Sequence, residues 1–171
     1  MTAPEIGQPA PDFSLPGLDG DLHILSNYLG RIIILNFWSA ECPWVERVDH
    51  AMLNWLPRFS CQTTWLSIAP NVNEPIDLIR KIAESRSLPL VLLDSDREVC
   101  NLYQAKVTPH LYVINPQGVL VYRGAYDDVT FRNRNPSRCY IQEVIHALVQ
   151  DMLPEINETQ QFGCSIVRFI P

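Results

Sequence analysis

Three short, mainly apolar runs, the first of them rich in β-branched residues, limit the fold of this chain more than any other feature. Segments with helical periodicity separate them, and the runs are RIIILNFW (31–38), TTWLSIA (63–69) and LPLVLLD (88–94). Continuous apolar runs of this kind are typical of strands that are buried on both faces of a sheet. Strands that alternate with helices pair in parallel through right-handed crossovers. The sequence therefore predicts an α/β fold, with a mixed central sheet and helices on both faces.

Further helices and a hairpin complete this arrangement. Apolar residues at helical spacing predict helices over 43–56, 73–87, 96–103 and 137–153. Asp96 is the expected cap of the third helix. The stretch 110–126 predicts a β-hairpin whose turn is Asn-Pro-Gln-Gly. We expect one domain over 1–153, followed by a tail over 154–171 that carries Cys164.

The net charge of −6 limits the possible partners. Nucleic acids and acidic membrane surfaces bind basic protein faces, so neither is an expected partner. The first residues lack the basic and apolar regions of a signal peptide, and the longest apolar runs are far too short to span a bilayer. We therefore expect a cytoplasmic protein.

The chain has five cysteines, an odd number with wide spacings. No Cys-x-x-Cys pair occurs, and Asp49 and His50 have no further ligands at matching spacing, so no metal site and no cofactor are expected. In a reducing compartment most of these cysteines should be free thiols. We expect Cys61 and Cys100 to pack in the core and Cys139 to be partly exposed on the last helix.

Cys42 lies where the first apolar strand runs into a helix that begins with Pro43. Unpaired N–H groups and the helix dipole stabilise a thiolate at such a point, and the carboxyl end of a parallel strand is where α/β sheets bind ligands. Val45 stands where a dithiol enzyme usually has its second cysteine. Cys42 is therefore either a reactive thiolate, with or without a distant partner, or a small buried residue at a strand–helix corner.

Four segments carry a resemblance to known proteins. FWSAECPW (37–44) resembles the active-site entry of the thioredoxin-like superfamily, and Thr108-Pro109 resembles the cis-proline loop that faces its reactive cysteine. The lead-in 7–31 and LVYRGAYDD (120–128) are similar to the redoxin branch, which contains alkyl hydroperoxide reductases and thiol-specific antioxidants. The resemblance spans Gly7 to about residue 150 and implies a thioredoxin-like three-layer fold.

The same resemblance implies a thiol-dependent oxidoreductase that uses Cys42 to reduce peroxides or disulfides. Reduction of peroxides would be an antioxidant activity. Its partners would be the substrate and an external thiol reductant, thioredoxin- or glutathione-like. Thr108 and Pro109 would hold the substrate backbone or crowd the sulfur, and Ser39 fits the hydroxyl position of peroxiredoxins. Independently of the resemblance, the place of Trp44 early in the helix makes it a candidate for an exposed docking surface.

The tail adds a narrower resemblance. QQFGCSIVR (160–168) is similar to the C-terminal segment of redoxin-domain proteins that end in Gly-Cys-Ser/Asn-Ile. This implies that Cys164 is the resolving partner of Cys42, carried to it by the tail.

The chain also departs from the family patterns. Val45 argues against a local dithiol, Leu35 replaces the proline of the peroxiredoxin pattern, and Arg123 is the nearest arginine on the hairpin. Glu46 is expected on a solvated helix face, and His110 can point toward Cys42 or away from it. Two functions stay open: a Cys42–Cys164 oxidoreductase, or a catalytically weak thioredoxin-fold module that binds or regulates.

Overall fold

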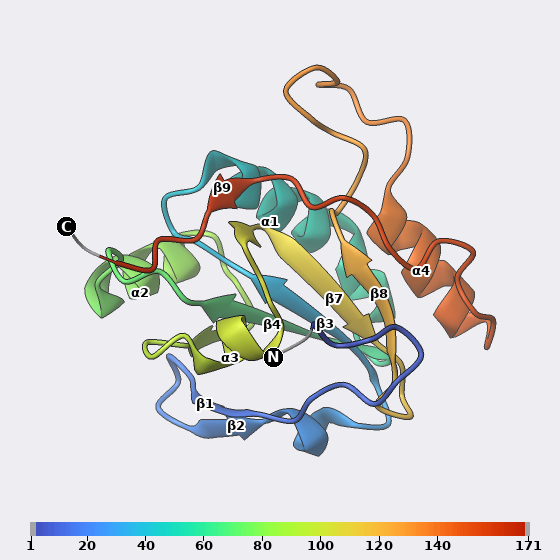
Figure 1. Ribbon diagram of the computed structural model, residues 1–171, viewed down its shortest axis with the longest axis horizontal. Coiled ribbons are helices and arrows are strands. Elements are labelled where there is room, and N and C mark those ends of the chain that lie inside the picture. Colours follow the sequence, from blue (N-terminus) through green and yellow to red (C-terminus); the bar gives the residue numbers. More distant parts are fainter. Residues whose placement is uncertain (1–2, 170–171) are drawn as a thin grey trace.

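The computed structural model describes residues 3–169, and its centre is a five-stranded mixed sheet in the order β5-β4-β3-β7-β8 (Figure 1). β3, β4 and β5 pair in parallel, whereas β7 pairs antiparallel with β3 and with β8. The bounds of these strands are Ile32–Phe37 (β3), Thr63–Ala69 (β4), Val91–Leu93 (β5), His110–Ile114 (β7) and Leu120–Gly124 (β8). The mixed sheet predicted from the three apolar runs and the hairpin is confirmed.

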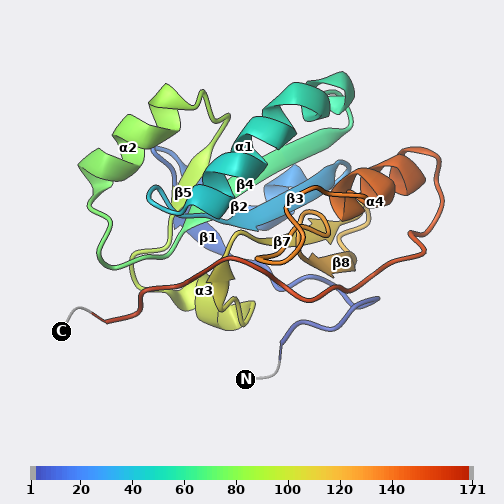
Figure 2. The same cartoon turned by 90° about the horizontal axis from the view of Figure 1, so that it is seen from above.

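Helices cover both faces of the sheet (Figure 2). α1, α2 and α4 lie on one face, and α3 lies on the other beside the β1–β2 hairpin. The bounds are Pro43–Trp55 (α1), Ile76–Ser85 (α2), Glu98–Leu102 (α3), Tyr140–Val149 (α4), Ser14–Pro16 (β1) and Leu22–Ile24 (β2), with single-turn 3₁₀ helices at Leu25–Tyr28 (η1) and Leu56–Phe59 (η2). This is the three-layer arrangement of thioredoxin-like proteins.

The central strand β3 is buried along its whole length, because successive side chains enter opposite cores. Ile33 and Leu35 pack against β1 and α3 residues, whereas Ile34 packs against α1 and α4 residues. This explains why five of its six residues are apolar, rather than every second one. Burial on both faces also holds the C-terminal end of β3 in place, and Cys42 and α1 follow this end in the chain.

Two local predictions are wrong. Asp96 does not cap α3; the carboxylate of Asp94 accepts hydrogen bonds from the N–H groups of Val99 (3.2 Å) and Cys100 (2.7 Å) instead. Cys61 is exposed rather than in the core, because it lies in the turn between η2 and β4. Cys100 is fully buried and Cys139 is partly exposed, as expected.

The C-terminal segment returns across the molecule and passes the N-terminal end of α1 (Figure 1). Its strand β9 (Cys164–Ser165) pairs antiparallel with β6 (Val107–Thr108), a pairing that the sequence did not predict. Residues 1, 2, 170 and 171, at the ends of the expected domain and tail, lie outside the described residues. Between residues 3 and 169, no helix has the length and apolar character needed to cross a membrane.

Candidate active site

Cys42 is the N-cap residue of α1, and Pro43 occupies the first helical turn. The side chain is almost fully buried, at 2% exposure. The first N–H groups of a helix have no partner within the helix and carry its positive partial charge. These groups favour a thiolate at Cys42 over a thiol.

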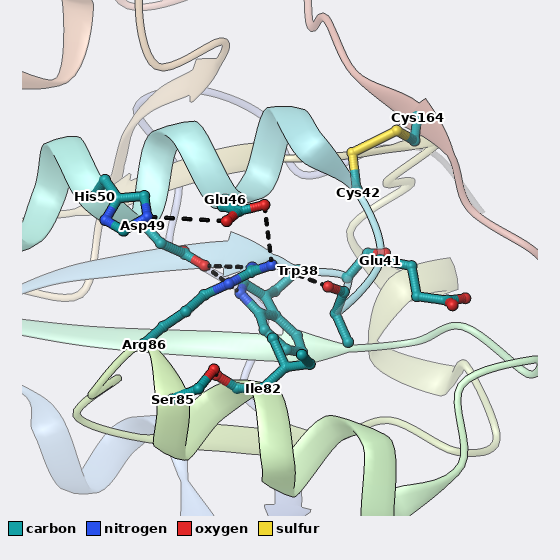
Figure 3. A network of polar contacts seen from close by, with 12 residues as sticks. Trp38, Glu41, Cys42, Glu46, Asp49, His50, Ile82, Ser85, Arg86 and Cys164 are labelled. Carbon is teal, nitrogen blue, oxygen red and sulfur yellow. Dashed lines mark hydrogen bonds and ion pairs between the residues drawn. A yellow bond between two sulfur atoms is a disulfide. The ribbon is translucent and has the colours of Figure 1, made fainter.

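The structure joins Cys42 to Cys164 in a disulfide (Figure 3). The two residues are 122 positions apart in the sequence, and their Cα atoms are 6.2 Å apart, within the range of ordinary disulfides. Cys164 reaches this position because β9 pairs with β6, with Cys164 opposite Thr108. The position of the missing local cysteine is taken by Val45, which is fully buried.

The loop that faces Cys42 contains Thr108 and Pro109, joined by a cis peptide bond. The carbonyl oxygen of Thr108 lies 3.2 Å from Cys42 Sγ. A disulfide sulfur has no proton to donate, so this contact becomes a hydrogen bond only when Cys42 is a thiol. The hydroxyl of Thr108 is buried and has no hydrogen-bond partner among the described residues. Thr108, Pro109, Cys42 and Cys164 are thus brought together.

Beneath the loop that leads into Cys42 lies the buried carboxylate of Glu74, which the sequence analysis missed. It accepts hydrogen bonds from the Ser39 hydroxyl and from the Ala40 N–H group (3.0 Å). The Ser39 hydroxyl is therefore engaged by Glu74. Nothing in the polar stretch before α2 distinguishes Glu74 in the sequence, because its partners are distant in the chain.

Glu74 also connects this loop to the tail. The side-chain amide of Asn71 donates to Glu74 (3.0 Å), and its carbonyl oxygen accepts the N–H group of Val167 (2.9 Å). The Val72 N–H group in turn donates to the Val167 carbonyl (3.2 Å). The buried carboxylate of Glu74 therefore holds the loop before Cys42 directly. Through Asn71 it also holds the segment that follows Cys164.

Replacing Glu74 by alanine should lower the free energy of unfolding by about 3 kcal/mol, because buried donors lose their acceptor. Glu74→Gln keeps one acceptor oxygen and should cost less. Glu84→Ala, an exposed change on α2, is the control and should have little effect. Urea unfolding of the oxidised proteins measures the difference. Equal stability of Glu74→Ala and Glu84→Ala would contradict this role.

A second polar network lies under the N-terminal half of α1 (Figure 3). Asp49, fully buried, accepts hydrogen bonds from Trp38 Nε1 (2.9 Å) and Arg86 Nη1 (3.0 Å). Arg86 also donates to the carbonyl of Ala40 (3.0 Å) and lies 3.7 Å from the exposed carboxylate of Glu46. Arg86 of the α2 C-terminus thereby fixes the chain two residues before Cys42.

Burial raises the pKa of the Asp49 carboxyl to about 6, against the opposing hydrogen bonds from Trp38 and Arg86. The folded protein thus holds this proton more tightly than the unfolded chain, where the pKa is near the model-peptide value. The resulting stability is complete below about pH 4 and is lost as the pH rises through about 6. A shift of about two pKa units corresponds to on the order of 3 kcal/mol.

Asp49→Asn should remove this contribution and flatten the decline of the free energy of unfolding between pH 4 and 7. Part of the decline should stay, because burial also raises the pKa of Asp94 to about 6. Urea titrations across this pH range measure the slope, with the exposed Asp77→Asn as control. An unchanged slope in Asp49→Asn would show that Asp49 does not titrate in this window.

The other candidate residues have definite places. Trp44 is half-buried in the first turn of α1, beside the tail. Arg123 is paired with Glu158 (2.9 Å). The His110 ring lies against Tyr112, with centroids 4.5 Å apart, and burial lowers its pKa to about 3, so it is neutral. Within the described part of the chain, no group of three or more metal-ligating side chains comes together.

Comparisons with known proteins agree with this geometry. The AhpC/TSA family model matches residues 6–123, which include Cys42 and the Thr108-Pro109 loop. The thiol-disulfide oxidoreductase ResA of Geobacillus kaustophilus is 35% identical over 118 residues, 68% of this chain and 67% of that protein.

Two solved structures match nearly the whole chain, the tail included. An uncharacterized conserved protein from Geobacillus kaustophilus has a TM-score of 0.88 at 25% identity, covering 98% of this chain and 94% of that one. A hypothetical protein from Sinorhizobium meliloti has a TM-score of 0.87 at 20% identity, covering 99% and 98%. From the family match and the thioredoxin-like fold, the chain belongs to the AhpC/TSA family of redoxins.

Proposed function

We propose that this protein is a thiol–disulfide oxidoreductase that cycles between a Cys42–Cys164 disulfide and two thiols. The observation that carries the proposal is the disulfide itself, placed at the N-terminus of α1 and against the Thr108-Pro109 loop. The similarity to ResA, named as a thiol-disulfide oxidoreductase, supports it. We further propose that the protein works in the cytoplasm, with an external thiol reductant.

The exposure of the two cysteines suggests which sulfur of the disulfide an external reductant attacks first. Cys42 is 2% exposed, whereas Cys164 is only partly buried. A reductant thiolate would therefore attack Cys164 Sγ, forming a mixed disulfide there and releasing Cys42 as a thiolate. The α1 N-terminus stabilises that leaving group. A second reductant thiolate then attacks the mixed disulfide, which completes a two-electron reduction and leaves both cysteines reduced.

In the substrate half of the cycle the protein passes these two electrons on to a substrate disulfide. The Cys42 thiolate attacks a substrate disulfide, forming a mixed disulfide and releasing one substrate thiolate. The Cys164 thiolate then attacks Cys42 Sγ, restores the Cys42–Cys164 disulfide and releases the second substrate thiolate. Because Val45 cannot resolve the mixed disulfide, the tail must supply the second thiol.

Peroxide reduction is the competing chemistry. Ser39 and Arg123, the residues nearest to the peroxiredoxin pattern, are engaged with Glu74 and Glu158. The test treats the reduced protein separately with hydrogen peroxide and with oxidised glutathione, and follows each cysteine by alkylation and mass spectrometry. We expect glutathione disulfide to drive Cys42–Cys164 formation at least about tenfold faster than it modifies the exposed Cys61.

With peroxide we expect no such advantage over Cys61. A Cys42–Cys164 bridge that forms rapidly with peroxide and slowly with glutathione disulfide would replace our proposal by a thiol peroxidase. No preference for Cys42 or Cys164 with either reagent would favour a catalytically weak module instead.

A further inference from the structure

The tail lies in the position that a substrate polypeptide needs for reaction with Cys42. β9 adds to β6 as an antiparallel strand, Thr108 pairs with Cys164, and Cys164 is bonded to Cys42. A peptide that adds as a strand gains main-chain hydrogen bonds, while neighbouring side chains select its sequence. The tail residues around Cys164 therefore indicate which side chains fit beside β6 and Cys42.

Phe162, two residues before Cys164, has an aromatic binding site made by other parts of the chain. The centroid of its ring lies 4.7 Å from that of Trp44 in α1 and 4.8 Å from that of Phe131 in the β8–α4 loop. Both pairs have edge-to-face geometry. Trp44 and Phe131 also contact each other at 5.5 Å, and the Arg134 guanidinium lies 5.1 Å from the Trp44 ring centroid. Such arrangements are the favourable ones for aromatic pairs. We call Trp44 and Phe131 the aromatic seat.

Phe131 carries exposed apolar surface beside the tail. Phe131 is 68% exposed even with Phe162 in place. Its loop projects beyond the sheet on the side where the tail passes (Figure 1). When the tail leaves, Phe162 leaves with it. Trp44 and Phe131 then remain as an adjacent apolar pair near Cys42.

The neighbouring tail positions are also constrained. A Cβ atom on Gly163 would lie 2.1 Å from the Thr108 carbonyl oxygen, so the residue before the cysteine must be glycine or the strand must shift. Ile166 is buried in the core beside α3, and its N–H group donates to the Lys106 carbonyl (3.0 Å). An aromatic residue, a glycine and a cysteine in succession thus fit the site beside β6 and Cys42.

We propose that the site acts on extended polypeptides that carry an aromatic residue two positions before the reacting cysteine. This deepens the proposed function and rests on it. In the reduced protein the tail leaves β6, and the substrate strand pairs with β6 and places its aromatic ring in the seat. The Cys42 thiolate attacks one sulfur of the substrate disulfide, and the other substrate sulfur leaves as a thiolate. The tail then returns, Phe162 re-enters the seat, and Cys164 displaces the substrate thiolate from Cys42.

The test uses the full chain with Cys164→Ala, so that Cys42 keeps any mixed disulfide it forms. Its substrates are the peptides QFGCSI and QAGCSI, each activated as a mixed disulfide with 2-nitro-5-thiobenzoate. Release of the coloured thiolate measures the rate, and the Cys42→Ser, Cys164→Ala double variant supplies the background from the other cysteines. Activated cysteamine, which has no aromatic ring, reports the intrinsic reactivity of Cys42. Both peptides compete with the same tail in the same variant, so the ratio of their rates isolates the effect of the aromatic ring.

We expect QFGCSI to react at least about tenfold faster than QAGCSI, and Phe131→Ala to reduce this ratio to below about threefold. Leu22→Ala, an exposed apolar change on β2, is the matched control and should keep the full ratio. Equal rates for the two peptides, with rapid reaction of activated cysteamine at Cys42, would overturn the aromatic preference alone. No reaction of Cys42 with any of the three reagents would overturn the proposed function as well.

Discussion

Replacing Cys42 by serine should lower the rate of disulfide reduction by this protein at least about 1,000-fold. A serine hydroxyl is a far weaker nucleophile than a thiolate, and Val45 offers no substitute sulfur. The assay follows reduction of a protein disulfide with dithiothreitol as the electron source. Cys61→Ser, which removes an exposed thiol in a distant turn, should keep nearly full activity.

Cys164→Ser separates the two roles in the cycle. This variant keeps the attacking thiolate, so it should still form a mixed disulfide with substrate but should not release it efficiently. Accumulation of a covalent substrate complex at Cys42, visible on non-reducing gels, is the expected result. Full turnover of Cys164→Ser without such a complex would show that the tail thiol has no part in resolution.

Gly163→Ala should weaken formation of the Cys42–Cys164 disulfide, with the equilibrium constant falling at least about 100-fold. The added Cβ would meet the Thr108 carbonyl oxygen at 2.1 Å and its carbon at 2.7 Å, and these are backbone atoms that cannot turn aside. The β6–β9 pairing must then separate, and the effective concentration of Cys164 at Cys42 falls.

The matched control for this change is Ser165→Ala, because Ser165 is the exposed neighbour in β9. Its disulfide equilibrium should change less than about threefold. Equilibration of each variant with glutathione buffers measures the constant. If Gly163→Ala matched the control, the tail would reach Cys42 without the strand pairing seen in the structure.

Local sequence patterns predicted most of the fold. The runs that form β3 and β4 are apolar enough to be recognised as buried strands, and α1 carries apolar residues at helical spacing after Pro43. The helix ends were less predictable: α4 spans Tyr140–Val149, inside the range expected. Asp94 caps α3 through bonds to residues five and six positions away, beyond a short-range capping pattern.

The candidate site was predictable only in part. The strand–helix junction identified Cys42, and the tail resemblance pointed to Cys164, but the two-residue strands β6 and β9 that align them have no periodicity to detect. Glu74 and Arg86 act through partners 34 and 46 positions away in the chain. Only tertiary packing defines such contacts, so a charged residue that anchors a loop looks like any surface residue in the sequence.

A redox titration of the wild-type protein tests the Cys42–Cys164 cycle most directly. Samples are equilibrated in glutathione buffers of graded potential, quenched with acid, alkylated and analysed by peptide mass spectrometry. We expect Cys42 and Cys164 to change together, in a single two-electron transition to one intramolecular disulfide, while Cys61, Cys100 and Cys139 form no intramolecular pair. Independent titration of Cys42 and Cys164, or their persistence as thiols at every potential, would contradict it.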